Sequence, residues 1–455
     1  MTTDDDPAIR SLNDAPVDEA GDYVLYWMQS SQRADDNAAL HTAILRANEL
    51  GKPVVALFAL MDDYPEASER HFAFMLEGLA ETSDRLADLG VRLVGRRAFP
   101  PEAALALARR AALVVTDAAY LRHLRDWRER LAADCAVRVL QVESDVVVPV
   151  GLASDKAEYA ARTIRPKIER HLEARANPVP RLRARHRADR LELSSEIDFD
   201  DPDGVLDSMS VDREVARVSR FRGGLSEARR RLAGFLRHHL DGYAERRADP
   251  ARTDTSELSP YLHFGQIGVV EIVAKVQGAG SGDAADRKAY LEELVVRREL
   301  ARNYTWFTPD YDAYAALPDW ARETLAEHRD DARPARYTRG ELERAETDDP
   351  YWNAAMEEMR RTGYMHNAMR MYWGKKVLEW CNTPEYAFRT LLYLNNRWFL
   401  DGRDPSSYAN VAWVFGLHDR PWQERDVFGK VRYMNAAGLE RKFDIEAYVE
   451  RVGKL

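Results

Sequence analysis

The chain has 455 residues, of which 45% are hydrophobic and 31% are charged, and its formal net charge is −10. This length exceeds a single ordinary core, so we expect a soluble globular protein of two domains with connections. The two cysteines lie far apart, no apolar run has membrane-spanning length, and the N-terminus lacks a basic and then apolar leader. These features argue against a disulfide scaffold and a membrane protein, and we expect a cytoplasmic monomer without a metal site.

Residues 1–21 form an acidic tail that we expect to be disordered. Residues 1–20 hold six acidic side chains and one arginine, so this tail carries about half of the negative excess. The rest of the chain is nearly balanced and rich in arginine. A local basic face for nucleic acid is therefore compatible with the acidic whole.

Residues 22–150 alternate short β-branched runs with amphipathic stretches. Continuous apolar strands separated by helices predict a parallel sheet covered on both faces, so we interpret this region as a doubly wound α/β domain. The first strand is followed by Gln29-Ser-Ser-Gln-Arg33 and not by G-x-G-x-x-G, which argues against a dinucleotide fingerprint. The predicted strands are 23–28, 54–60, 91–94, 113–116 and 137–142, and the predicted helices are 37–50, 70–89, 101–110 and 121–133.

Residues 151–220 mix prolines and acids with five arginines between positions 181 and 190. We interpret this region as a connector, and a position near a phosphate backbone is the alternative for its arginine cluster. Strand patterns then disappear, and residues 221–455 predict an all-helical domain. Its main predicted helices are 225–246, 287–306, 353–361 and 365–380.

Six tryptophans lie between positions 352 and 435, and this segment carries the strongest functional signal. In the helix predicted over 365–380, Met369, Trp373 and Trp380 fall on one stripe. Trp373 and Trp380 are seven residues apart, about 10 Å along a helix, which suits electron hopping. Indole is easily oxidised by an excited flavin, but core packing by itself also explains such a stripe.

Arg370 lies at the edge of this stripe, and an arginine among apolar neighbours requires a carboxylate partner. Asp401, in the turn Leu400-Asp-Gly-Arg-Asp404, is placed to supply it. With the amide of Asn395, the pair offers the donors and acceptors that the polar edge of a flavin needs. An ordinary ion pair with a helix cap at Asp401 or Asp404 explains the same residues.

The segment Thr253-Asp-Thr-Ser-Glu-Leu-Ser-Pro-Tyr261 is typical of a helix start. Hydroxyls at Thr255 and Ser256, with free N–H groups at the helix start, would suit a diphosphate. Tyr243 and Arg247 just upstream could close over the same ligand. A helix cap without a ligand is the alternative.

Two charged segments have both a structural and a functional interpretation. Glu293 forms a helical i, i+4 pair with Arg297 in the structural interpretation, and it touches a pyrimidine edge in the functional one.

Residues 413–422, followed by Arg432, alternate cations with indoles around a proline-stiffened turn. This composition suits filling the gap that an extruded base leaves in a duplex, while a solvated loop over a core tryptophan is the alternative.

After the acidic tail, nearly the whole chain resembles the class II cyclobutane pyrimidine dimer photolyases, with several independent blocks in the family's order. The resembling segments are Tyr26–Asn37, Leu258–Gln266, Leu291–Leu300, Met365–Trp373, Leu400–Asp404, His418–Trp422 and Phe428–Asn435. The resemblance implies an α/β domain that can hold an antenna pigment, such as a deazaflavin or a folate, and a helical domain that holds bent FAD. Ser30 and Ser31 depart from the family, because they replace a charged pair.

The resemblance also implies roles for single residues by matching position. The implied contacts of the adenine and diphosphate are Tyr243, Arg247, Thr255, Ser256 and Leu258. The implied contacts of the isoalloxazine are Arg370, Asn395, Asp401 and Asp404, with Asn395 at N5. The implied photoreduction relay, in order from the flavin, is Trp373, Trp352 and Trp380.

On the DNA side, Glu293 resembles the acid that touches the flipped dimer, and Met371 and Trp413 resemble the walls of its pocket. Arg420 and Trp422 resemble the pair that intrudes into the DNA bubble, and Arg432 resembles a backbone contact. Val296 and Arg297 depart from the family, because they stand where many photolyases carry a tryptophan.

We therefore expect light-driven repair of UV-damaged DNA, in which reduced anionic FAD passes an electron to a flipped pyrimidine dimer. Extrusion of the target nucleotide is a general property of photolyases and is inherited here from the resemblance. A flavin photoreceptor without repair activity is the first alternative, and a DNA-binding helical protein without a cofactor is the second. Retention of Glu293, Met371, Arg420 and Trp422 favours repair.

Overall fold

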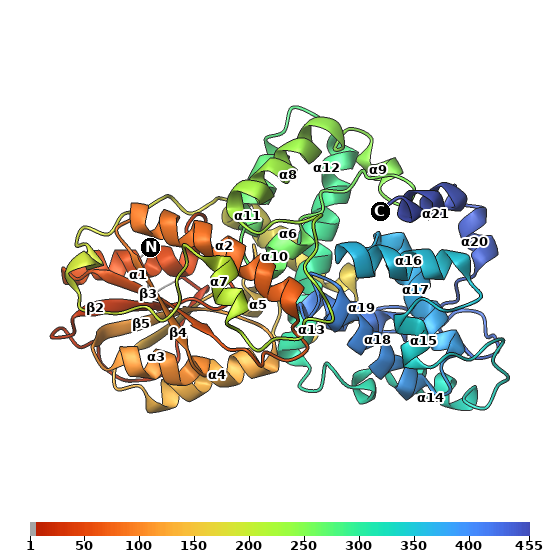
Figure 1. Cartoon of the computed structure of the whole chain (residues 1–455), viewed down its shortest axis with the longest axis horizontal. Coiled ribbons are helices and arrows are strands. Elements are labelled where there is room, and N and C mark those ends of the chain that lie inside the picture. The colour runs from red at the N-terminus through yellow and green to blue at the C-terminus, as the bar shows by residue number, and fades with distance from the viewer. Residues whose placement is uncertain (1–5) are drawn as a thin grey trace.

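The computed structural model describes residues 6–455, and it shows an α/β domain and a helical domain side by side (Figure 1). The α/β domain is built on a six-stranded sheet in the order β1-β6-β5-β2-β3-β4. All neighbouring strands are parallel except β1, which pairs antiparallel with β6. The strands are β1 (Ile9–Ser11), β2 (Tyr23–Trp27), β3 (Val54–Leu60), β4 (Arg92–Arg97), β5 (Ala111–Asp117) and β6 (Val139–Val142).

Helices cover both faces of the sheet, so the predicted doubly wound fold is confirmed. Helices α1 and α2 lie on one face, and α3 and α4 lie on the other (Figure 1). Helix α1 begins where the Asn37 side chain accepts a hydrogen bond from the N–H of Leu40, and it ends at Gly51, whose φ of 67° is left-handed. The helices are α1 (Ala38–Leu50), α2 (Glu69–Asp88), α3 (Pro100–Ala108) and α4 (Arg122–Asp134).

The N-terminal tail corrects one prediction. Residues 1–21 were predicted to be disordered, but within the described part Ile9–Ser11 forms β1 at the edge of the sheet. Asn13 continues this pairing, because its amide nitrogen donates to the carbonyl of Val137 at 3.0 Å and its oxygen accepts from the N–H of Val139 at 3.0 Å. Residues 1–5 lie outside the described part of the chain.

The predicted connector contains helices that its composition did not reveal. Its arginine cluster lies against the α/β domain, where the N–H of Ala184 donates to Leu89 at 2.9 Å and the N–H of Arg185 donates to the Asn48 side chain at 2.8 Å. The elements here are α5 (Val150–Ala153), α6 (Ala161–Arg175), the 3-10 turn η2 (Ala188–Arg190) and α7 (Pro202–Asp207).

The helical domain breaks two of the predicted helices. The helix predicted over 225–246 ends at His238, and a new turn starts after Gly242, whose φ is 70°. The helix predicted over 287–306 is interrupted by a π-helical segment, η3 (Glu292–Arg297). The other elements are α8 (Leu225–His238), α9 (Tyr243–Arg246), α10 (Ser259–His263), α11 (Val269–Gln277), α12 (Ala284–Leu291), α13 (Arg298–Phe307), η4 (Tyr314–Ala316), α14 (Asp319–Glu327), α15 (Arg339–Glu343), α16 (Pro350–Thr362), α17 (Asn367–Trp380), α18 (Pro384–Trp398), α19 (Pro405–Val414), α20 (Ala436–Glu440) and α21 (Ile445–Gly453).

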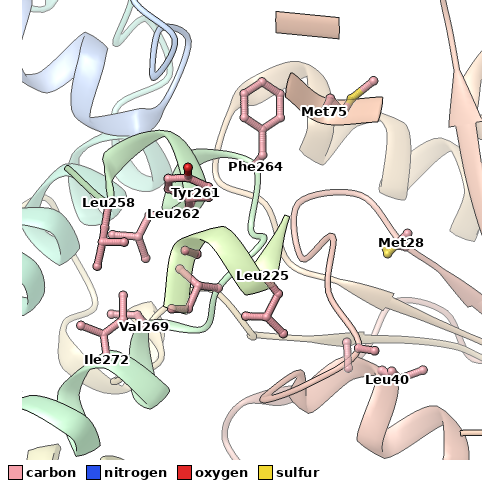
Figure 2. Packing of buried hydrophobic residues seen from close by; sticks show 14 of the residues in the cluster. Met28, Leu40, Met75, Leu225, Leu258, Tyr261, Leu262, Phe264, Val269 and Ile272 are labelled. Carbon is pink, nitrogen blue, oxygen red and sulfur yellow. The ribbon is translucent and has the colours of Figure 1, made fainter. Parts of the chain in front are cut away.

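One hydrophobic core joins the two domains (Figure 2). Met28, Leu40 and Met75 of the α/β domain belong to the same buried cluster as Leu225 and Ile272 of the helical domain. Because this apolar surface is buried only when the domains are docked, the core fixes their relative position.

Among residues 6–455, no helix has the length and apolarity needed to cross a membrane.

Candidate active site

The predicted pair of Arg370 and Asp401 is present and tightly held. The two terminal nitrogens of the Arg370 guanidinium donate to the two carboxylate oxygens of Asp401 at 3.1 and 3.0 Å. The guanidinium also lies 3.9 Å from the centre of the Phe399 ring. A side chain at Gly402 would come within 2.8 Å of the Asn395 carbonyl oxygen, so only glycine lets the turn pass this close to the end of α18. Helix α17 and this turn therefore hold the pair from two sides.

Three indoles form a continuous file behind this pair. The rings of Trp373 and Trp352 are nearly parallel at 15°, with centroids 6.4 Å apart, and Trp352 meets Trp380 at 5.5 Å. Trp352 is fully buried and comes from α16, so it stands between the two indoles of α17. Spacing along α17 alone did not reveal this bridge. The contact order of the rings is the order that the resemblance implied.

The outer end of the file reaches a tyrosine that the sequence did not single out. The ring of Tyr337 meets Trp380 edge-on at 5.1 Å, and its hydroxyl donates to the Asp348 carboxylate at 3.0 Å. At the inner end, Trp373 packs on Phe399 at 5.9 Å, the same ring that Arg370 covers. The file therefore runs from a partly exposed tyrosine to the Arg370 and Asp401 pair.

Trp373 carries an open hydrogen-bonding position. Its indole Nε1–H is buried and has no acceptor among residues 6–455. Leaving such a donor unpaired costs about 1–3 kcal/mol, so native proteins seldom do it without a further group at the site. Asn395 is also buried, and its amide nitrogen donates to Asn396 at 3.1 Å. These groups could hold a polar aromatic ligand.

The hydroxyls of the helix-start segment meet tyrosines and do not cap α10. The Thr255 hydroxyl hydrogen-bonds with the Tyr364 hydroxyl at 3.0 Å, and Tyr290 donates to Ser256 at 2.9 Å. Leu258 is buried and immediately precedes α10, which no side chain of the described residues caps. The simple cap alternative is therefore wrong here. This segment is linked to the Arg370 side of the site, because Tyr364 lies between α16 and α17.

Glu293 has a different partner from the one its spacing predicted. It pairs with Arg247 at 2.9 Å, and both side chains keep more than a third of their surface exposed. Arg297 pairs with Glu292 at 3.2 Å, and Arg165 pairs with the same carboxylate at 2.7 Å. The expected Glu293 and Arg297 pair is therefore wrong, because the π-helical turn changes which side chains align. Of the two glutamates, Glu293 is the less engaged.

Tyr243 stands beside the Arg247 and Glu293 pair. It is buried, and its ring meets Tyr290 at 5.5 Å. Burial raises the pKa of its hydroxyl, so the group stays neutral at physiological pH. Tyr243 and Ser256 therefore both contact Tyr290, and Arg247 lies beside Tyr243.

Asp404 serves as a helix cap and an ion-pair partner. It accepts from the N–H of Ser406 at 2.7 Å at the start of α19, and Arg302 binds both of its oxygens at 2.9 and 3.0 Å. Burial opposes ionisation, but the charge of Arg302 holds the pKa of Asp404 well below its usual value. The helix-cap alternative is confirmed for this residue, and its carboxylate lies in the wall of a separate cavity.

That cavity, of about 150 Å³, lies between the two domains. Its walls include the residues that follow the carboxyl ends of β2, β3 and β5, where the strand order reverses and α/β proteins usually bind ligands. Asp117 shapes this edge by accepting from the N–H groups of Gln29, Ser30 and Ser31 at 2.6 to 2.8 Å. The amide nitrogen of Gln29 and the amide oxygen of Gln32 are buried without partners among the described residues.

A cationic and aromatic surface surrounds Asp419, which the sequence did not single out. Its carboxylate accepts from the Arg432 guanidinium at 2.8 and 3.1 Å and from the indole N–H of Trp422 at 3.3 Å. Arg432 lies 4.2 Å from the ring centre of Trp422 and 5.6 Å from that of Trp413. Arg420 covers Trp422 at 5.2 Å. The predicted DNA-contacting residues therefore form one connected group.

Lys375 lies beneath this surface. It is fully buried, its ammonium group donates to the carbonyl of Val414 at the end of α19, and it lies 5.2 Å from the Trp413 ring centre. Burial lowers the pKa of Lys375 to about 7.

Met371, one turn earlier on α17, is partly exposed. Within the described chain, no cluster of histidine, cysteine or acidic side chains is arranged to hold a metal ion.

Comparisons with known proteins define the class of the fold. A family model described as DNA photolyase matches residues 24–184. A class III photolyase from Agrobacterium tumefaciens superposes with a TM-score of 0.73 at 21% identity, over 95% of this chain and 86% of that chain. A photolyase from Sulfolobus tokodaii with two FAD molecules gives 0.68 at 17% identity, over 94% of this chain and 89% of that chain. The two-domain architecture is therefore that of the photolyases.

Sequence identity then shows the family. A deoxyribodipyrimidine photo-lyase from Methanothermobacter thermautotrophicus is 46% identical over 444 residues, which span 98% of this chain and 97% of that protein. The chain belongs to the photolyase/cryptochrome family. The predicted combination of an α/β domain and an all-helical domain is confirmed.

The ion pair at the site should contribute to stability. Asp401→Asn leaves the half-buried guanidinium of Arg370 without its counter-charge, so the free energy of unfolding should fall by about 1–3 kcal/mol. Asp22→Asn is the matched control, because Asp22 pairs with Arg110 at 2.7 Å with nearly half of each side chain exposed. Its effect should stay within about 0.5 kcal/mol. Equal losses in chemical denaturation of the two variants would contradict a special role for the buried pair.

Lys375 should make stability depend on pH. Its folded-state pKa of about 7 lies below the unfolded value, so burying the charged form costs most below about pH 7 and the cost fades as pH rises. Lys375→Met removes this cost, and its stability relative to the unsubstituted protein should therefore decrease steadily between about pH 7 and 10. Denaturation at a series of pH values checks the sign. A difference that stays constant or grows with pH would show that folding does not lower the pKa of Lys375.

Proposed function

We propose that this chain uses light to repair UV-damaged DNA, as a class II cyclobutane pyrimidine dimer photolyase. The observation that carries the proposal is the file of Trp380, Trp352 and Trp373, which ends beside the Arg370 and Asp401 pair in a member of the photolyase/cryptochrome family. The Methanothermobacter relative is named for action on pyrimidine dimers, and the Sulfolobus photolyase holds FAD.

FAD fits the residues that surround the inner end of the file. The unpaired N–H of Trp373 offers a donor, α18 contributes the buried amide of Asn395, and Arg370 and Asp401 offer charge of both signs. Tyr243, Thr255 and Ser256, which contact Tyr290 or Tyr364, would hold the adenine and diphosphate together with the buried Leu258. Reduced anionic FAD, when bound, would supply the electron that splits the cyclobutane ring.

The chain's own residues would place the damaged base. Glu293, which pairs with Arg247 and is 39% exposed, would donate a hydrogen bond to the flipped dimer in its protonated form and so stabilise the dimer's developing negative charge. Met371 and Trp413 would form walls of the dimer pocket. Trp422 and Arg420 would fill the space that the dimer leaves in the duplex, and Arg432 would bind a phosphate.

The cavity between the domains is the proposed site of an antenna pigment. His71 of the cavity wall donates to the backbone carbonyl of Phe399 at 2.9 Å, and the Phe399 ring packs on Trp373 of the tryptophan file. The unpaired amide groups of Gln29 and Gln32 give a pigment one donor and one acceptor. A deazaflavin or a folate both carry such groups.

Repair should be measurable directly. The photoreduced protein, mixed with an oligonucleotide that contains one thymine dimer, should restore the two thymines under blue light and leave them linked in the dark. Chromatography of the oligonucleotide provides the measurement. Dimers that persist in light while the flavin is reduced normally would overturn repair and favour a photoreceptor. A colourless protein that also fails to take up FAD would favour a DNA-binding protein without a cofactor.

The tryptophan file should be needed for photoreduction and not for repair. Trp373→Phe removes the innermost indole, so light should no longer reduce the oxidised flavin, because phenylalanine is much harder to oxidise than tryptophan. The same variant reduced chemically should still repair dimers. Trp306→Phe is the control, since this partly buried indole packs against Tyr120 and Arg125 near the α/β domain. Normal photoreduction by Trp373→Phe would remove the proposed electron path.

A further inference from the structure

Two cations of the connector lie beside the predicted DNA-contacting loop without a role in the proposed reaction. Lys156 precedes α6 in the chain, and Arg162 lies in the first turn of this helix. Both side chains are exposed. Among residues 6–455, neither forms an ion pair with a carboxylate. They are therefore available to an anionic partner.

The connector is joined directly to the loop that carries Arg420 and Trp422. The hydroxyl of Tyr159 donates to the backbone carbonyl of Asp419 at 2.8 Å, and the Nδ1–H of His418 donates to the carbonyl of Tyr159 at 2.8 Å. Tyr159 is 47% exposed and Trp422 is 40% exposed. Of the large hydrophobic side chains exposed within residues 6–455, these two are the aromatic ones, and both are hydrogen-bonded to Asp419.

The backbone of this part of the connector is fixed. The amide of Asn303 on α13 donates to the carbonyl of Lys156 at 2.9 Å, and its oxygen accepts from the N–H of Glu158 at 2.7 Å. The guanidinium of Arg162 lies 6.0 Å from the centre of the Tyr159 ring. Because the main chain is already ordered, these side chains can meet a ligand with little further loss of backbone freedom.

We propose that Lys156, Tyr159 and Arg162 extend the DNA-binding surface and contact backbone phosphates that flank the extruded dimer. Exposed cations next to an exposed aromatic ring bind a phosphate backbone without reading sequence. A chain of net charge −10 repels a duplex overall, so its attraction for DNA must come from local groups of this kind. The inference rests on the proposed function, because that function brings DNA to the neighbouring loop.

The test is a salt titration of binding, with the full-length protein and a duplex that carries one thymine dimer. In the variant with both Lys156→Ala and Arg162→Ala, the slope of log affinity against log salt should fall by about two, since each phosphate contact contributes about 0.9. Affinity at about 50 mM salt should drop roughly tenfold or more, for damaged and undamaged duplexes alike. Repair by the saturated complex should be unchanged, because neither residue touches the reacting bases.

Two further variants provide matched controls. Arg162→Lys keeps the charge and should keep the slope. Arg109→Ala removes an exposed arginine that follows α3 in the α/β domain and has no ion pair among the described residues, and it should change nothing. If the unsubstituted protein repairs the dimer but the double variant keeps its slope, the extension is overturned and the proposed function stands. If the unsubstituted protein neither binds nor repairs the dimer, both fall together.

Discussion

The geometry of the candidate site depends on Arg70, which reaches from α2 of the α/β domain into the helical domain. Its buried guanidinium meets no carboxylate of residues 6–455 and donates at 2.7 to 3.2 Å to the backbone carbonyls of Ala216, Met359, Arg360 and Trp398. Three of these carbonyls lie at the carboxyl ends of α16 and α18, where the helix dipole favours a positive charge. Burial lowers the pKa of Arg70 to about 10, so it remains charged at neutral pH. One cation thus ties two helices of the site to the sheet domain.

The turn that follows α18 connects the end of this helix, which Arg70 holds, to both the proposed flavin site and the proposed antenna site. Its first residue, Phe399, packs against Trp373 and Arg370, and Asp401 two residues later completes the ion pair. Asp404, at the end of the turn, caps α19 and lines the cavity between the domains. The proposed flavin and antenna sites therefore share one short piece of backbone.

Local patterns in the sequence were sufficient to predict the parallel strands and the ion pair between Arg370 and Asp401. Apolar periodicity reports burial directly, and an arginine on an apolar helix edge needs a carboxylate. Contacts between segments that lie far apart in the sequence could not be predicted from such local patterns. Glu293 and Arg247 are 46 residues apart, and the π-helical turn that aligns them has no recognisable sequence signal. For the same reason Tyr337 and Asp419 were missed, and β1 was taken for a disordered tail.

The central claim is that a flavin occupies the space beside Trp373, Asn395 and the Arg370 and Asp401 pair. The most direct measurement is an experimental structure of the protein purified with, or reconstituted with, FAD. The claim predicts flavin density within hydrogen-bonding reach of the Trp373 indole N–H and the Asn395 amide, with the tryptophan file leading away from it. Side chains that close on one another at this position, or a flavin bound elsewhere, would contradict it.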